Sequence, residues 1–137
     1  VSLDELLARS DFISLHPRLT DETRGMIDAA AIARMKPGVR IVNAARGAIL
    51  DAPALADALR SGHVAGAAVD VYPQEPPSPD YPLIGLPNVI HTPHLAASTA
   101  DAQVAVAVLA AEQMAAALLR GEYRNVTNPA ALPASSG

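Results

Sequence analysis

The sequence predicts an α/β fold in which short parallel strands alternate with helices and a long helix follows the last strand. Helix-like and strand-like segments alternate along the chain, which is typical of parallel βαβ units. Half of the 137 residues are hydrophobic, yet only three are Tyr, one is Phe and none is Trp. The core therefore has to be packed from Ala, Val, Leu and Ile between regular elements.

The first helix and strand are predicted from a capping pattern followed by an apolar run. Residues 2–5, Ser-Leu-Asp-Glu, form a capping box that opens a helix through about Arg9. Residues 11–16 follow as an apolar run of strand length. We expect this run to be the first strand of the sheet.

The second helix–strand pair has clear boundaries. Asp28 can cap a helix that runs through Met35, and Pro37-Gly38 stops it. Residues 39–43 are mainly β-branched and predict the second strand.

The third pair begins where Asp51 can cap a helix with Pro53 in its first turn and Gly62 as its C-terminal cap. Residues 64–71 predict the third strand. Five of the ten residues 73–82 are Pro, which removes backbone donors and predicts a loop. Residues 88–91 predict a short fourth strand.

A long helix is expected to close the ordered part of the chain. Ser98 with Asp101 would open it, apolar residues recur at helical spacing, and Gly121 would end it. The tail after Asn125 is expected to be irregular.

Net charge, the Cys count and the length of apolar runs limit the kinds of molecule that the protein is expected to bind. Ten basic and fourteen acidic residues give a formal charge of -4, which offers no electrostatic footprint for nucleic acid or anionic membranes. The absence of Cys excludes a disulfide framework and a thiolate metal site, so no metal is expected. No apolar run approaches the roughly 18 residues of a membrane span, and the first residues show no charged n-region followed by an apolar h-region. A small-molecule partner and a cytoplasmic location are expected.

Polar residues collect at the ends of the four predicted strands. His16 ends the first, residues 43–47 (Asn-Ala-Ala-Arg-Gly) the second, Asp70 the third, and residues 92–94 (Thr-Pro-His) follow the fourth. Because parallel strands end at one edge, and ligands of open α/β sheets bind there, these residues predict a binding crevice. Loops are polar in any case, so each residue alone is weak evidence.

Each residue has an ordinary and a functional interpretation. Arg46 could be a surface cation or a planar fork that holds a carboxylate and polarises a carbonyl. His94 could be a core histidine or a general acid/base, for which imidazole suits neutral pH. Glu75 could be a solvated loop carboxylate or the partner of His94, and Asp70 could equally cap a helix.

Four motifs in order resemble the D-isomer-specific 2-hydroxyacid dehydrogenases, with phosphoglycerate dehydrogenase-like sequences nearest. They are residues 42–47 (VNAARG), 65–72 (AGAAVDVY), 75–76 (EP) and 92–95 (TPHL), and the likeness extends to 125–129 (NVTNP). The resemblance implies the second half of a Rossmann-like, doubly wound parallel sheet. Residues 1–97 would be the C-terminal half of an NAD-binding domain, and 98–137 an interdomain helix and tail.

The same resemblance implies roles for individual residues. Arg46 would bind the substrate carboxylate and carbonyl, His94 would be the general acid/base, and Glu75 would pair with His94. Asp70 would contact the nicotinamide end of the cofactor. The other residues expected to line the cofactor, with Arg46 and His94, are His16, Pro17, Ala44, Ala45 and Ala97. Two positions depart from the family pattern: Arg18 stands where Pro is frequent, and Ala96 stands where Gly is frequent.

The eight glycines include no G-x-G-x-x-G, and no strand precedes the first helix to carry the acidic residue expected on the ribose. We therefore expect a piece of a longer polypeptide that is inactive alone, with NAD as the cofactor, NADP not excluded, and a homodimeric parent. The expected function is hydride transfer between NAD(H) and a D-2-hydroxy or 2-oxo acid. The alternatives are a dinucleotide-sensing module of corepressor type without turnover, and an interaction fragment with no small-molecule role.

Overall fold

The structure is a computed structural model that describes residues 1–128 and 130. They form two compact units, Val1–Ala96 and Ala97–Gly137. The elements of the first unit are α1 (Leu3–Arg9), β1 (Phe12–Leu15), α2 (Ala29–Ala33), β2 (Val39–Asn43), the 3-10 helix η1 (Gly47–Ile49), α3 (Ala52–Ser61), β3 (Val64–Val69) and β4 (Val89–His91). The second unit contains α4 (Ala100–Arg120).

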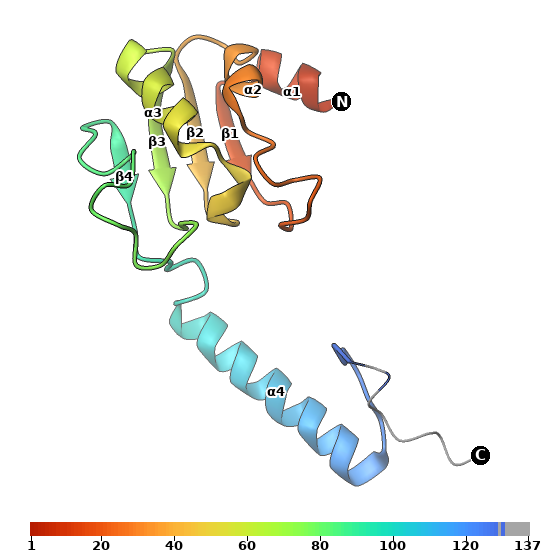
Figure 1. Cartoon of the computed structure of the whole chain (residues 1–137). Coiled ribbons are helices and arrows are strands. Elements are labelled where there is room, and N and C mark those ends of the chain that lie inside the picture. Colours follow the sequence, from red (N-terminus) through yellow and green to blue (C-terminus); the bar gives the residue numbers. More distant parts are fainter. Residues whose placement is uncertain (129, 131–137) are drawn as a thin grey trace. The chain divides into compact units, whose positions relative to one another are not determined.

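The four strands form one parallel sheet in the order β1-β2-β3-β4, which confirms the predicted fold class (Figure 1). The register pairs the last residues of the strands with one another: Leu15 with Asn43, Asn43 with Val69, and Val69 with His91. All four strands therefore end in one row. The loops that leave this row carry the predicted site residues.

The core lies between the sheet and the helices of the first unit. In β2, Val39, Ile41 and Asn43 are buried, while Arg40 and Val42 between them are exposed. The same alternation leaves Phe12 of β1 and Ile90 of β4 exposed. One face of the sheet is thus packed in the core, and the other face is open in the part of the chain that the structure describes.

The helix caps follow the sequence closely. The side chains of Ser2, Asp28 and Asp51 each accept a hydrogen bond from a backbone N–H of the first turn that they cap, which confirms three predicted starts. Gly62 ends α3 in the left-handed conformation, as predicted. Element ends differ by a few residues, most clearly at α2, which stops at Ala33 instead of Met35.

The first and third strands are shorter than predicted. The first covers Phe12–Leu15 and not 11–16, and the third ends at Val69 and not at residue 71. The backbone N–H of Asp70 still donates to the Asn43 carbonyl, 2.9 Å away. The Asp70 side chain contacts the loop after β4, as described below.

The second unit is dominated by α4, which is capped one residue later than predicted. The Thr99 hydroxyl, and not Ser98, accepts from the Ala102 N–H at 3.2 Å, and Gly121 ends the helix as expected. By length and composition this helix could cross a membrane, with a mean hydropathy of 1.7 over its best 18 residues. The sequence prediction concerned uninterrupted apolar runs only, and Glu112 and Gln113 interrupt the apolar residues of this helix. A core helix of a soluble protein has the same character. The predicted irregular tail lies largely outside the described residues.

Candidate active site

The loop that displays Arg46 is shaped by a buried amide side chain. Asn43, at the end of β2, is only 1% exposed. Its Nδ2 donates to the Arg46 carbonyl at 3.1 Å, and its Oδ1 accepts from the Ala45 N–H at 3.1 Å. These two contacts close residues 43–46 into a turn that leaves the Arg46 side chain exposed.

Five of the predicted cofactor residues line one surface pocket of about 400 Å³ beside this turn. The pocket is lined by His16, Pro17, Arg18, Leu19, Ala44, Ala45 and Arg46. The structure thus brings together the loops after β1 and β2, as the alignment of the strand ends requires. The His16 Nε2 lies 2.8 Å from the Ser14 hydroxyl, and the Arg46 Nη1 donates to the Ala45 carbonyl at 2.7 Å.

Glu75 and His94 form the predicted pair. The Glu75 Oε2 lies 2.8 Å from the His94 Nδ1, although the residues are 19 positions apart. Both side chains remain partly open to solvent, at 38% and 44% exposure. The other carboxylate oxygen, Oε1, accepts from the Tyr72 N–H at 3.1 Å. The bond to His94, and then the bond from Tyr72, hold the Glu75 pKa below its ordinary value.

Gly47 brings the two halves of the site into contact. A Cβ at this position would lie 2.1 Å from the Tyr72 carbonyl carbon and 2.3 Å from the Pro73 nitrogen. Only a residue without a side chain allows this approach, because both atoms belong to the backbone. The glycine therefore lets the segment that leads into Glu75 pass directly beside the loop of Arg46.

Asp70 binds the loop that carries His94. Its Oδ1 accepts from the Thr92 hydroxyl at 2.5 Å and from the Leu95 N–H at 2.7 Å, and its Oδ2 accepts from the Ala96 N–H at 3.0 Å. Burial raises the Asp70 pKa, but the Thr92 hydroxyl, the two N–H groups and the nearby His94 together hold it below the ordinary value. None of these donors belongs to a helix, so the interpretation of Asp70 as a helix cap is wrong. Its contact with a nicotinamide stays a prediction.

A second polar network supports the loop between β3 and β4, and the sequence did not indicate it. The Tyr72 hydroxyl lies 3.2 Å from the His91 Nδ1, and the His91 Nε2 lies 3.2 Å from the Leu83 carbonyl. The Tyr72 pKa is raised by burial and by the negative charges of Asp70 and Glu75. Residues such as Asn43 and His91 could have been found as polar side chains at inward-facing positions of a strand.

Ala97, which was also predicted to line the cofactor, belongs to the second unit. There its carbonyl accepts from the Gln103 Nε2 at 3.1 Å. Its proposed contact with the cofactor stays a prediction.

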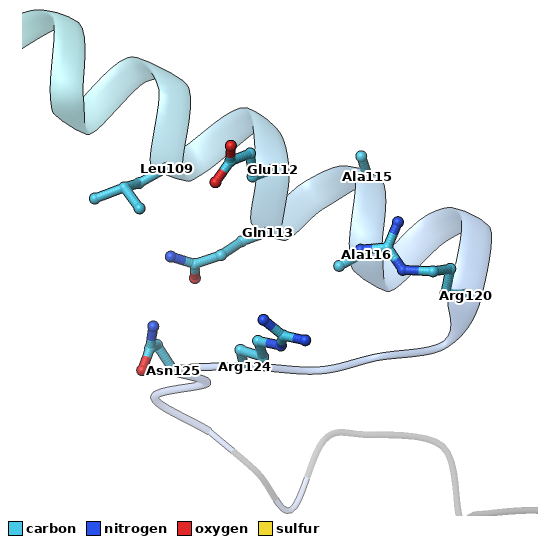
Figure 2. A pocket seen from close by; sticks show the side chains of 8 residues that line it. All are labelled: Leu109, Glu112, Gln113, Ala115, Ala116, Arg120, Arg124 and Asn125. Atoms are coloured by element: carbon cyan, nitrogen blue, oxygen red, sulfur yellow. The ribbon is translucent and has the colours of Figure 1, made fainter.

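The second unit has a hollow of its own, of about 430 Å³, between the end of α4 and the segment after it (Figure 2). Arg120 and Arg124 line it, but both are paired with the Glu122 carboxylate, at 3.3 and 2.9 Å. Both arginines share this single carboxylate in solvent-exposed pairs, which contribute little energy, so we assign no ligand to this hollow.

The pocket beside Arg46 combines small residues with one cationic side chain. Ala44, Ala45 and Pro17 are small, which leaves room for a flat ring, and the Arg46 guanidinium lies at the same pocket. The sequence contains no glycine-rich loop that would bind the pyrophosphate.

Known proteins resemble this chain in sequence. The sequence model described as "D-isomer specific 2-hydroxyacid dehydrogenase, NAD binding domain" matches residues 1–96. A D-3-phosphoglycerate dehydrogenase of Mycobacterium leprae is 54% identical over 123 residues, which are 90% of this chain and 23% of the relative. The D-3-phosphoglycerate dehydrogenase of Archaeoglobus fulgidus is 49% identical over 128 residues, 93% of this chain and 24% of the relative.

Solved structures give the same result. A glyoxylate reductase from Paecilomyes thermophila superposes with a TM-score of 0.84 at 41% identity, covering 90% of this chain and 38% of that one. A D-isomer specific 2-hydroxyacid dehydrogenase from Xanthobacter autotrophicus Py2, in complex with NADPH and MES, superposes with a TM-score of 0.66 at 39% identity, covering 80% and 47%. The chain spans about a quarter of the length of the curated relatives it matches.

Proposed function

The chain belongs to the D-isomer specific 2-hydroxyacid dehydrogenases, whose NAD-binding domain its residues 1–96 match, and on this premise we propose that it supplies their acid–base and carboxylate-binding residues. The proposed reaction interconverts a D-2-hydroxy acid and a 2-oxo acid. The observation that carries the proposal is the bond between Glu75 and His94, placed at the strand-end edge that also holds Arg46.

His94 is proposed to exchange the hydroxyl proton of the substrate. Its Nδ1 faces the Glu75 carboxylate at 2.8 Å, which fixes a proton on Nδ1 and leaves Nε2 as the nitrogen that can face a substrate oxygen. In the reduction, protonated Nε2 gives its proton to the carbonyl oxygen, and in the oxidation it takes that proton back. The bound NAD supplies the hydride donor or acceptor at C2.

Arg46 is proposed to bind and orient the substrate acid. Its guanidinium is an exposed planar fork whose Nη1 is steadied by the Ala45 carbonyl. The remaining N–H groups can donate to a carboxylate and to the neighbouring carbonyl oxygen. Polarising that carbonyl favours the reduction, because negative charge develops on the oxygen.

These 137 residues alone are proposed to bind the dinucleotide very weakly at best. The proposed NAD contacts are confined to His16, Pro17, Ala44, Ala45 and Arg46, with Asp70 and Ala97 as further candidates. The loop that binds the pyrophosphate has to come from other polypeptide, so we propose that the isolated chain lacks dehydrogenase activity. The complete dehydrogenase, meaning the polypeptide that joins these residues to that loop, is proposed to be a cytoplasmic homodimer.

The proposal is tested by turnover in the complete dehydrogenase. NADH oxidation by 2-oxo acids should be observed, and His94→Gln should reduce kcat by about 10²- to 10⁴-fold, which is the usual contribution of a general acid/base. His63→Gln is the matched control, because His63 is bonded to the Ile32 carbonyl at 2.9 Å, away from the strand-end row. Dinucleotide-dependent association without turnover would support the corepressor type of module instead.

A further inference from the structure

The loop that carries His94 has an unfavourable backbone conformation, which requires stabilising contacts. His94 has a φ of 57°, in the left-handed region that residues with a side chain seldom adopt. Such a conformation is unfavourable and persists only where the surrounding structure enforces it.

The Asp70 carboxylate contacts this loop on both sides of the strained residue. The Thr92 hydroxyl precedes His94 in sequence, and the N–H groups of Leu95 and Ala96 follow it. Asp70 as a residue is 9% exposed, so the three contacts of its side chain are largely shielded from water. The backbone N–H of Thr92 also donates to the Val69 carbonyl at 3.1 Å, which ties the start of the loop to β3.

We propose that Thr92 is a positioning residue, and that its hydroxyl with the Asp70 carboxylate forms a clamp that holds His94 in the left-handed conformation in which its Nδ1 meets Glu75. The catalytic consequence rests on the proposed function, but the clamp itself does not. Without the hydroxyl, Asp70 keeps two backbone donors on one side of His94 and loses the donor on the other. The loop then gains other conformations in which the imidazole leaves the carboxylate.

The clamp is tested first in the 137-residue chain, by hydrogen exchange of single amides measured by NMR. Thr92→Val removes the hydroxyl and keeps the shape, and should lower the protection of the Leu95 and Ala96 amides roughly five- to tenfold, the scale of one hydrogen bond. Thr92→Ser restores a hydroxyl and should restore the protection. Thr127→Val, at an exposed position, should change neither amide.

The catalytic consequence is tested in the complete dehydrogenase. Thr92→Val should lower kcat several-fold with little change in KM for the dinucleotide, and Thr92→Ser should recover most of the loss. A fold defect would lower the amount of active enzyme and would not be rescued selectively by Ser. If Thr92→Val does not fold, Asp70→Asn tests the clamp from its other side and should expose the same two amides.

Wild-type protection of Leu95 and Ala96 in Thr92→Val, or in Asp70→Asn, would overturn the clamp. Loss of protection with unchanged kcat would overturn the positioning role. Failure of the proposed function gives a different result, since His94→Gln would then leave activity intact while the amide measurements still report on the clamp.

Discussion

At the scale of single residues, the site depends on hydrogen bonds at some positions and on a missing side chain at another. Asn43 holds the turn before Arg46 by two hydrogen bonds, whereas Gly47 contributes only the space that it leaves empty. Glu75 holds His94 from a loop with few backbone donors. Substitutions at Arg46, Glu75 and Gly47 should therefore affect substrate binding, proton transfer and backbone packing respectively.

Arg46→Lys in the complete dehydrogenase should lower kcat/KM for the oxo acid about ten- to a hundredfold, since an ammonium cannot reproduce two parallel bonds to a carboxylate. Both a higher KM and a lower kcat are expected, because Arg46 is proposed to contact the carbonyl as well. Steady-state kinetics with Arg24→Lys, at an exposed position, provides the control. Wild-type kinetics in Arg46→Lys would remove this arginine from the site.

Glu75→Gln should displace the pH profile without abolishing activity. The lowered Glu75 pKa keeps this carboxylate ionised at every pH above the ordinary glutamate value, and its stabilising effect is lost only as the pH falls through the lowered value. At neutral pH the Glu75 carboxylate is therefore ionised and accepts from the His94 Nδ1–H. Without it, reduction of the oxo acid, which needs protonated His94, should fail at a lower pH than in the wild type.

Rates of oxo-acid reduction measured across the pH range check this displacement, with Glu22→Gln, in an exposed loop, as the control. An unmoved limb would mean that Glu75 is only a loop carboxylate.

Gly47→Ala should damage the site and the fold together. The added carbon would overlap the backbone of Tyr72 and Pro73, so that segment has to move and carry Glu75 away from His94. Overpacking of this kind costs about 1–3 kcal/mol. The free energy of unfolding in urea and kcat should both fall. Gly66→Ala, whose added carbon would lie 3.2 Å from the Asn88 carbonyl oxygen, is the milder comparison. Wild-type kcat in Gly47→Ala would contradict the close approach.

At the scale of elements, helices α1 to α3 contribute buried residues to the core that supports the strands. Leu55 of α3 is fully buried in the core, whereas Leu118 of α4 is 77% exposed. The same change, Leu→Ala, should therefore destabilise the fold strongly at Leu55 and only slightly at Leu118. Burial of these helices determines stability, and the loops determine chemistry.

Leu55→Ala should lower the free energy of unfolding by about 2–5 kcal/mol, the cost of removing a buried leucine side chain and leaving a cavity. Leu118→Ala should change it by less than about 0.5 kcal/mol. Urea titration of both variants, followed by circular dichroism, checks the contrast. An equal loss in the two variants would mean that the exposed face of α4 is covered in solution.

The elements were largely predictable because their signals are local. Ser2, Asp28 and Asp51 each cap the helix that follows within three residues, and the β-branched run of β2 needs no distant partner to be recognised. Thr99 was missed because Ser98 next to it has the same capping chemistry.

The site was only partly predictable because its contacts are distant in sequence. The pairing of Glu75 with His94 followed from resemblance to a family and not from spacing. The bond from Thr92 to Asp70 spans 22 positions and that between Tyr72 and His91 spans 19, and neither leaves a local pattern. The left-handed backbone of His94 also escaped prediction, since few residues with a side chain adopt it and it depends on contacts with Asp70.

At the scale of the whole molecule, we propose that the chain supplies the acid–base and carboxylate-binding residues of a dehydrogenase, while the sequence contains no glycine-rich loop for the pyrophosphate. The pocket beside Arg46 can receive the nicotinamide end, but association with a dinucleotide also bears the entropic cost of immobilising it. In a complete domain that cost is offset by pyrophosphate bonds to a helix N-terminus and a carboxylate on the ribose. Binding by the chain alone should be very weak.

The most direct measurement is a calorimetric titration of the 137-residue chain with NADH, alone and after addition of a separately expressed polypeptide that carries the glycine-rich loop, with a parallel assay of oxo-acid reduction. Binding and turnover are expected only in the mixture, and mixtures made with His94→Gln should bind NADH without turning over. Micromolar binding by the chain alone would contradict the proposal that a separate glycine-rich loop is needed to hold the dinucleotide. Equal turnover by the His94→Gln mixture would contradict the proposed role of His94 in proton transfer.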